Sequence, residues 1–380
     1  MEVVRTWKEK RRTKVDNNGG VVIISWCWSA GNYGQILQAY ALQSVLQHLG
    51  MNPITVSYLE KDKRKAKKKG TAYKEGIIEK CKFQHFILKY MNPVIQCATL
   101  NEVERVCKNY KIYICGSDQI WNPNYIKENK VYTLDFGGKA KRIAYAPSVG
   151  INGVSDKNMN VMADMAKKIN KIDFLSVRET TAKEILERWV HKKVEVVLDP
   201  TLLVSRREWL KIASKRRCQE SYVFVYIIGK IEVYQRLIRQ IADKYQVEKI
   251  IWLNVIKNSS FNDERVKKVN TVTPEDFLSY INYASVIITD SFHGVMFSVK
   301  FQKDFFVLER KYQKRSLEKD SRIDDILERL DLKERKVRNI NDVNQIELKI
   351  NFKKVNLNYR EERKRSLLFL KKALEGDIDE

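Results

Sequence analysis

The sequence predicts an α/β protein with two Rossmann-like domains that face one another across a cleft. Short apolar runs alternate with helical patterns along the chain, which is typical of parallel strands covered by helices on both faces. This cycle restarts near residue 206, and 380 residues are enough for two domains of roughly 100–200 residues each. Ligands are therefore expected between the domains, at the carboxyl ends of the strands.

The first half begins with a basic arm at 1–19, and an apolar run follows at 21–28. This run is short, contains two tryptophans and leads into a glycine turn, so it indicates a buried strand rather than a secretory signal. A helix is expected at 35–50, with Gly50 as its stop. The later elements are expected as a strand at 53–59, a loop at 61–75, a helix at 76–91, strands at 111–115, 141–150 and 171–179 and a helix at 180–190. The run "VEVVLDPTLL" at 194–203 then leads towards a domain boundary near residue 205.

The second half repeats the alternation and ends in a long amphipathic helix. In "TPED", Thr273 can cap a helix and Pro274 suits its first position. Strands are expected at 222–229, 249–254, 285–290 and 305–309, with helices at 231–245, 273–281, 295–301 and 359–376. The predicted units are a flexible basic arm at 1–19, an N-terminal domain at 20–205, a C-terminal domain at 206–355 and a C-terminal helix at 356–380 that crosses back to the first domain.

The net charge of +24 calls for an anionic partner, whether nucleic acid, a phosphorylated metabolite or an acidic membrane surface. Dense basic runs at 61–70 and 214–218 are each expected to be solvated faces or loops. Nucleic acid is disfavoured, because the sequence contains no zinc-finger spacing, no RRM-type aromatic motif and no basic region followed by heptads.

Cysteine usage indicates a reduced, cytoplasmic protein. The six cysteines form no C-x-x-C pair, and no histidine and cysteine set has metal-ligand spacing. The D-x-D formed by Asp377 and Asp379 lies in the terminal tail, so metal-dependent chemistry is disfavoured. No apolar stretch approaches the roughly 20 residues that a membrane span needs.

Two polar clusters follow predicted strands in the first half. Residues Gly31, Asn32, Tyr33 and Gly34 form a turn whose free N–H groups could hold an anion or a sugar hydroxyl, although Gly-x-x-Gly is common and the residues alone favour a plain strand-to-helix turn. The second cluster, "GSDQIWNP" at 116–123, offers either a sugar site or a capped turn with a packed tryptophan. Its candidate ligands are Ser117, Asp118, Gln119 and the ring of Trp121.

Cationic candidates follow two further strands. Arg178 lies where a strand meets a helix; it can pair with Glu179 or hold a phosphate or carboxylate with its guanidinium fork. His293 lies in the turn "SFHG" before a short helix, where the helix dipole and free N–H groups attract anions. A structural histidine is the alternative. Arg322 is a further cation, with a solvated surface position as its alternative.

Taken together, "GNYGQILQAYAL", "GSDQIWNP", "SVRE", "LDPTLL", "TDSFHGVMFSVKF" and "SRIDDILERL" resemble the polysaccharide pyruvyl transferase family of bacteria. The motifs occur in that family's order and cover roughly residues 20 to 332. The family is similar to the two-domain glycosyltransferase architecture called GT-B. The resemblance implies transfer of a pyruvyl group from phosphoenolpyruvate to hydroxyls of a glycan or glycan precursor, with release of phosphate and no other cofactor.

The resemblance also implies roles for the candidate residues. Arg178, Arg322 and the turn of Ser291, Phe292, His293 and Gly294 would bind the donor, and His293 would also protonate the leaving phosphate. Asp118 would be a base for an acceptor hydroxyl, with the 31–34 turn, Ser117, Gln119 and Trp121 around the acceptor. Some family members have arginine just before this histidine, where this sequence has Ser291 and Phe292.

Two other functions fit the same sequence. A GT-B glycosyltransferase would bind a nucleotide diphosphate, whereas a pyruvyl transferase would bind phosphoenolpyruvate. A basic module for nucleic acid or membrane would lose binding steeply with salt and would not need His293. The charge is also compatible with an enzyme that acts on lipid-linked sugars at the acidic inner face of the cell membrane, as a peripheral protein.

Overall fold

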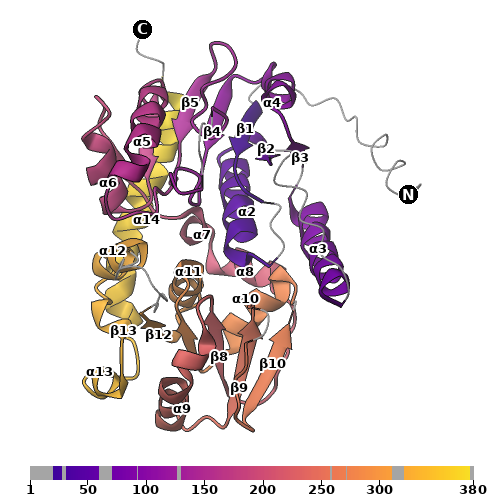
Figure 1. Cartoon of the computed structure of the whole chain (residues 1–380), viewed down its shortest axis with the longest axis vertical. Coiled ribbons are helices and arrows are strands. Elements are labelled where there is room, and N and C mark those ends of the chain that lie inside the picture. Colours follow the sequence, from indigo (N-terminus) through magenta and orange to yellow (C-terminus); the bar gives the residue numbers. More distant parts are fainter. Residues whose placement is uncertain are drawn as a thin grey trace.

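The computed structural model describes residues 20–27, 31–59, 71–91, 93–125, 130–256, 259–270, 272–309 and 321–376, with the backbone alone at 71–76. The predicted arm at 1–19, the basic run at 61–70 and the acids of the terminal tail lie outside the described residues. The described chain forms two parallel sheets, which Figure 1 shows one above the other.

The N-terminal sheet contains seven described strands in the order β3-β2-β1-β4-β5-β6-β7, all paired in parallel. Its central strands are apolar on both faces because helices cover both sides. The strands are β1 (Gly20–Ile24), β2 (Asn52–Tyr58), β3 (Val94–Cys97), β4 (Ile112–Cys115), β5 (Lys141–Ala144), β6 (Phe174–Val177) and β7 (Glu195–Val196).

The C-terminal sheet contains six described strands in the order β10-β9-β8-β11-β12-β13, again all parallel. The strands are β8 (Tyr222–Ile227), β9 (Lys249–Asn254), β10 (Val266–Asn270), β11 (Val286–Thr289), β12 (Asp304–Leu308) and β13 (Lys336–Val337). In each sheet the strand order reverses at the centre, between β1 and β4 and between β8 and β11. Loops at the carboxyl ends of such neighbours diverge and leave room for a ligand.

The helices alternate with the strands as the sequence predicts. They are α2 (Tyr33–His48), α3 (Thr71–Tyr90), α4 (Leu100–Cys107), α5 (Asp156–Ile169), α6 (Thr180–Glu187), α7 (Pro200–Leu203), α8 (Arg206–Ile212), α9 (Gln235–Lys244), α10 (Pro274–Tyr283), α11 (Phe292–Phe301), α12 (Ser321–Arg329), α13 (Ile340–Asn344) and α14 (Phe352–Glu375). Two predicted helix-end signals are confirmed, Gly50 at the end of α2 and Thr273 at the start of α10. Gly50 has φ +80° just beyond α2, and the Thr273 hydroxyl accepts a hydrogen bond from Asp276 N at 3.1 Å.

Several boundaries differ from the sequence prediction. Residues 71–75, predicted as loop, belong to α3, and the last helix begins at Phe352 rather than at 359. Strands β3, β7, β10 and β13 and helices α4, α5, α7, α8, α12 and α13 were not predicted. Edge strands such as β10, with the sequence VKKVN, are half solvated and lack the apolar run that identifies a central strand.

Helix α14 crosses from the C-terminal sheet back to the N-terminal one, as predicted (Figure 1). At its far end Lys141 Nζ of β5 donates to Leu374 O at 3.0 Å. In its middle Ser366 Oγ accepts a hydrogen bond from Leu198 N at 2.8 Å. A single core cluster contains residues of both sheets, so the two halves pack directly on each other. Among the described cysteines, five are buried thiols, and Cys81 is exposed.

Candidate functional site

The loop after β4 places Ser117 and Asp118 at the first switch point. Gly116 has φ +132°, and a Cβ atom on it would lie 1.9 Å from the carbonyl oxygen of Tyr145, so only glycine fits there. Ser117 N donates to Gln38 Oε1 at 3.0 Å, and Ser117 Oγ donates to Ala146 O at 2.8 Å. The hydroxyl also lies 3.2 Å from Asp199 Oδ2. This loop is therefore held from three directions.

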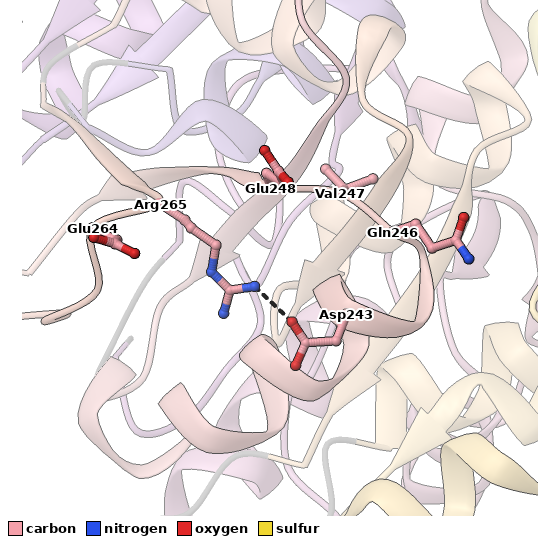
Figure 2. A pocket seen from close by; sticks show the side chains of 6 residues that line it. All are labelled: Asp243, Gln246, Val247, Glu248, Glu264 and Arg265. Atoms are coloured by element: carbon pink, nitrogen blue, oxygen red, sulfur yellow. Dashed lines mark hydrogen bonds and ion pairs between the residues drawn. The ribbon is translucent and has the colours of Figure 1, made fainter.

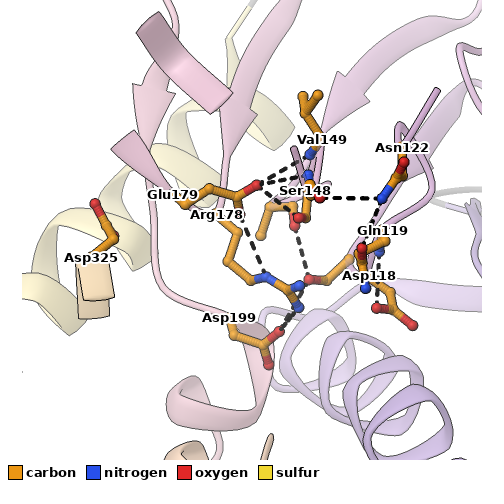
Figure 3. A network of polar contacts seen from close by, with 12 residues as sticks. Asp118, Gln119, Asn122, Ser148, Val149, Arg178, Glu179, Asp199 and Asp325 are labelled. Carbon is orange, nitrogen blue, oxygen red and sulfur yellow. Dashed lines mark hydrogen bonds and ion pairs between the residues drawn. The ribbon is translucent and has the colours of Figure 1, made fainter. Parts of the chain in front are cut away.

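Arg178, which follows β6, forms a buried ion pair with Asp199. Its Nη1 lies 2.9 Å from Asp199 Oδ2, and both side chains are almost fully buried. The guanidinium also lies over the ring of Phe292, 4.1 Å from its centroid, in a cation–π contact. Asp199 caps the short helix α7, where its Oδ1 accepts hydrogen bonds from Thr201 N and Thr201 Oγ1 at 3.0 and 2.7 Å. Figure 3 shows this pair within a larger polar network.

His293 enters the same network from the other domain. It lies in the first turn of α11, whose N-cap is Ser291. A Cβ atom on Gly294 would lie 2.3 Å from Thr289 Oγ1, so this glycine lets the helix start pack against the end of β11. His293 Nε2 lies 3.6 Å from Asp199 Oδ2, within ion-pair range but longer than a hydrogen bond. Asp199 thus faces an arginine of one domain and a histidine of the other.

The start of α2 closes the other side of the imidazole. A Cβ atom on Gly34 would lie only 2.0 Å from His293 Nδ1, so the absence of a side chain at Gly34 allows this contact between domains. The first turn of α2, with its free N–H groups and positive dipole end, therefore lies against His293, which itself belongs to the first turn of α11.

Two side chains at this junction, Arg178 and His293, have buried nitrogens without a hydrogen-bond partner among the described residues. These atoms are Nη2 and Nε of Arg178 and Nε2 of His293. Leaving a buried donor unpaired costs about 1–3 kcal/mol, and more for a charged group, so each such atom needs a partner such as water, an ion or a ligand. Since Arg178 is a cation and the imidazole of His293 can donate a hydrogen bond beside the start of α2, the arrangement is suited to bind an anion.

Burial and charge shift the two neighbouring carboxyl groups in opposite directions. Burial alone would raise the pKa of Asp199, but His293 and then Arg178 hold that pKa well below its usual value. Burial raises the pKa of Glu179, and the charge of Arg178 and the hydrogen bond from Ser148 oppose this only in part. Asp199 is therefore the permanent negative partner of the cations.

Glu179 connects the arginine to the loop after β5. Its Oε1 accepts hydrogen bonds from Ser148 Oγ at 2.7 Å and from Val149 N at 3.1 Å. Ser148 N in turn donates to Asp118 O at 2.8 Å, which joins this loop to the loop after β4. The predicted pairing of Arg178 with Glu179 is present only as a longer contact of 3.8 Å, because Asp199 takes the shorter one.

The other predicted residues fall into two groups. Asp118 has φ +76°, which aspartate tolerates, and its Oδ1 accepts a hydrogen bond from Gln119 N at 2.9 Å. Gln119 Oε1 accepts one from Asn122 Nδ2 at 2.9 Å. Arg322, in the first turn of α12, is close enough to lower the pKa of Glu179 by its charge. Asp118, Gln119 and Arg322 form the first group, which lies around the same network.

Two aromatic candidates lie in the core instead. Trp121 is fully buried, and its Nε1 donates to Tyr132 O at 2.8 Å, so the ring faces that the sequence analysis assigned to a sugar are covered. The ring of Tyr33 is stacked on Phe277 of the other domain, 4.8 Å between centroids. Asn32 caps α2, and its Oδ1 accepts a hydrogen bond from Gln35 N at 3.0 Å. At this turn it is the backbone that faces His293.

Sequence reasoning missed Asp199 as a site residue. The signal was present in "LDPTLL", where an acid precedes a proline at the end of a strand. That pattern indicates a helix cap, which Asp199 also is. Its contacts with Ser117, Arg178 and His293 depend on three distant segments and on the meeting of the two domains.

A separate hollow of about 720 Å³ lies on the C-terminal domain. Figure 2 shows its lining residues, including Arg265, whose Nη1 donates to Asp243 Oδ1 at 2.6 Å. Its residues 246–248 and 264–265 precede β9 and β10, so it lies at the amino ends of the strands. Ligands of open α/β sheets bind at the opposite edge, and we therefore place the candidate site at the junction of Arg178, Asp199 and His293.

Comparison with solved structures shows the fold. A protein of Listeria monocytogenes assigned as a UDP-N-acetylglucosamine 2-epimerase aligns over 95% of this chain and 98% of its own, with 13% identity and a TM-score of 0.50. The UDP-GlcNAc 2-epimerase of Methanocaldococcus jannaschii, in complex with UDP-GlcNAc and UDP, aligns over 93% and 99%, with 15% identity and a TM-score of 0.49. Arabidopsis thaliana UGT89C1, complexed with quercetin, aligns over 94% and 96%, with 11% identity and a TM-score of 0.46. The predicted GT-B-like α/β fold is confirmed.

The family model for polysaccharide pyruvyl transferase matches residues 32–312. The chain therefore belongs to the polysaccharide pyruvyl transferase family, as its motifs suggested. Comparison with curated proteins finds no match. Within the described residues, no helix is both long and apolar enough to span a membrane, and no group of three or more histidine, cysteine or acidic side chains could hold a metal ion.

Proposed function

We propose that the protein transfers the pyruvyl group of phosphoenolpyruvate to two hydroxyls of a sugar or lipid-linked oligosaccharide and releases phosphate. The observation that carries this proposal is the set of unpaired buried side-chain nitrogens on Arg178 and His293. Phosphoenolpyruvate has a phosphate and a carboxylate on adjacent positions of one small molecule. An arginine and a histidine that meet beside the start of α2 suit such a ligand.

The reaction needs proton transfers that balance. The methylene carbon of the donor gains a proton, and the first sugar hydroxyl attacks the resulting cationic carbon and loses its own proton. The bond from that carbon to the phosphate oxygen then breaks. The second hydroxyl closes the ketal, and its proton leaves with the phosphate. The two hydroxyls therefore lose two protons in total. One balances the proton that the methylene carbon gained, and the other is carried away by the phosphate.

The donor residues would act mainly by charge. Arg178 would bind the donor with the Nη2 that Asp199 leaves unused, and His293 would contact the bridging phosphate oxygen and protonate it as it leaves. Asp199 would act as a positioning residue, because its negative charge faces the imidazole and fixes the direction of the arginine fork. Arg322 would add positive charge at the edge of the site.

The acceptor residues would lie on the N-terminal domain. Asp118 Oδ1 is engaged by Gln119 N, whereas Oδ2 accepts no hydrogen bond from the described residues, so this oxygen is the proposed base for a sugar hydroxyl. The backbone of the Gly31–Gly34 turn and Ser117 would complete this side. Trp121 is buried and has no place in the proposed site.

Calorimetric binding of phosphoenolpyruvate, compared with UDP, tests the donor assignment. We expect phosphoenolpyruvate to bind the wild type and His293→Ala to weaken that binding at least about tenfold. Circular dichroism of the variant provides the control for folding. Binding of UDP but not of phosphoenolpyruvate would assign the chain to nucleotide-sugar chemistry on the same fold, and our proposal would then be wrong.

A further inference from the structure

Helix α3 exposes an apolar stripe on its outer face. Ile77, Ile78 and Leu88 are 43%, 53% and 58% exposed, and Cys81 is also exposed. Successive residues of a helix are about 100° apart, so these four positions lie within an arc of about 100°. Exposed apolar residues are common singly, but a stripe along three turns of one helix indicates a contact surface.

The opposite face of α3 is fixed to the N-terminal domain. Phe83 and Phe86 are buried, with their rings 5.2 and 5.9 Å from those of Tyr33 and Tyr40 on α2. The helix therefore has one apolar face for the core and a second that the described residues leave exposed. Figure 1 shows α3 at the outer edge of the molecule, on the side away from α14.

Positive charge borders the exposed stripe. Lys80 and Lys89 are exposed on either side of it, and His85 lies within it. In the sequence, the run "KDKRKAKKKG" at 61–70 immediately precedes the helix and contains seven basic residues and one acid. An apolar helix face flanked by lysines is the pattern of helices that lie in the interface of an anionic bilayer, where lysines meet lipid phosphates and apolar side chains enter the acyl boundary.

We propose that the outer face of α3 docks on an anionic lipid surface. Charge complementarity favours this occupant over a second copy of the chain, because a chain of net charge +24 would bring like charges together at such an interface. The exposed leucines of α14, Leu357 and Leu368, form no such stripe, because the exposed residues between them are all charged: Arg360, Glu361, Lys364 and Arg365.

Docking through α3 would bring the lipid surface close to the acceptor side of the site. Glu79, on the inner side of α3, approaches the turn before α2: a Cβ atom on Gly31 would lie 2.7 Å from its Oε1. If the acceptor sugar is attached to a lipid, which rests on the proposed function, the membrane under α3 would contain the lipid part of the acceptor. Only α3 itself would then separate that membrane from the Gly31–Gly34 turn. Lipid binding itself does not depend on that reaction.

Co-sedimentation with vesicles tests the proposal. The full-length wild type is expected to bind vesicles of equal parts phosphatidylglycerol and phosphatidylcholine, and to bind pure phosphatidylcholine much less. The double variant Ile77→Asp, Leu88→Asp is expected to lose at least about tenfold in partition, because it removes two apolar contacts and adds two negative charges. The matched control is Leu357→Asp, Leu368→Asp on α14, which should bind vesicles as the wild type does.

Three results would overturn the docking proposal. The α3 variant could bind the vesicles like the wild type, or the α14 control could lose binding to the same extent. The third is a wild type that is dimeric by light scattering and an α3 variant that is monomeric with vesicle binding unchanged. Binding of phosphoenolpyruvate, measured on each variant, confirms folding and separates failure of docking from failure of the proposed reaction.

Discussion

Two arginines of this protein are equally buried but are used differently. Arg178 and Arg335 are each 3% exposed, and Nε of each lacks a hydrogen-bond partner among the described residues. Arg335 Nη2 donates to Glu347 O at 2.8 Å and its Nη1 to Leu348 O at 3.2 Å, so both ends of its fork hold a loop of the C-terminal domain. Arg178 uses Nη1 on Asp199, but its Nη2 has no such partner in the described part of the chain.

We interpret the difference as that between a structural cation and a cation of the proposed donor site. Burying a guanidinium is costly, and carbonyl groups that occupy both ends of its fork compensate for the lost water. At Arg178 only part of that compensation comes from the protein, and the aromatic face of Phe292 and the charge of Asp199 hold the group in place. The remaining donor capacity is then available to an anion. The two arginines should therefore respond differently to the same substitution.

The largest expected effect is on catalysis at Arg178. Arg178→Lys keeps the charge, so Asp199 retains a cation, but it loses the flat fork and the second donor. We expect kcat/KM for phosphoenolpyruvate to fall by about 100-fold or more, with little change in the far-ultraviolet circular dichroism spectrum. Steady-state phosphate release with an acceptor measures the effect. Near-normal kcat/KM would remove Arg178 from the donor site.

The matched substitution, Arg335→Lys, should act on stability. The single ammonium group of a lysine could not make both of the hydrogen bonds that Arg335 donates to Glu347 O and Leu348 O. Each lost hydrogen bond costs about 1 kcal/mol. We expect the free energy of unfolding to fall by about 2 kcal/mol in urea denaturation, with kcat/KM of the folded enzyme unchanged. A loss of activity comparable to that of Arg178→Lys would mean that burial, rather than spare donors, distinguishes functional arginines here.

A smaller effect is expected where the domains touch at the site. Gly34→Ala would place a methyl group against the imidazole of His293 and force it away from its position. We expect about a tenfold loss of kcat, with KM for phosphoenolpyruvate changed less. Gly138→Ala is the control, since a Cβ atom there would contact nothing within 4 Å. Equal activity of the two variants would show that His293 does not need its present position.

The smallest effect concerns a third buried cation, Lys300. Its Nζ donates to Leu202 O at 2.7 Å, and burial, with the charge of Arg363, lowers its pKa to about 7. Between that pKa and the unfolded value of about 10.4, the unfolded chain binds more protons, so this group makes stability rise with pH. In Lys300→Met, we expect the rise in unfolding free energy from about pH 7.5 to about pH 8.5 to be about 1 kcal/mol smaller. Urea denaturation of both proteins at both pH values measures this. An equal rise in unfolding free energy for the wild type and Lys300→Met would contradict the prediction.

The sequence predicts most of the fold because central strands and helix ends depend on nearby residues. The run at 222–229 is apolar enough to be a buried strand wherever it lies, and Gly50 and Thr273 mark helix ends by their own backbone and side-chain chemistry. Edge strand β10 was missed because its exposed side chains are polar. Local pattern thus identifies elements that are buried on both faces better than those at an edge.

The candidate site was less predictable. Arg178 and His293 were predicted as candidates because an arginine at a strand end and a histidine at a helix start have a recognisable chemistry. Asp199 was missed because its partners lie far away in the sequence, and Trp121 was misassigned because the cover of its ring comes from the later segment around Tyr132. Residue type and local position suggest what a side chain can do, whereas its partners decide what it does.

The chain passes between the two domains twice, through residues near α7 and again through α14. The two passages are joined to each other: Tyr359 Oη of α14 donates to Leu202 O at 2.6 Å, and Arg363 Nη2 donates to Leu203 O at 2.8 Å. The two crossings are therefore one connection and not two independent ones, and a substitution at Tyr359 or Arg363 would act on both of them at once.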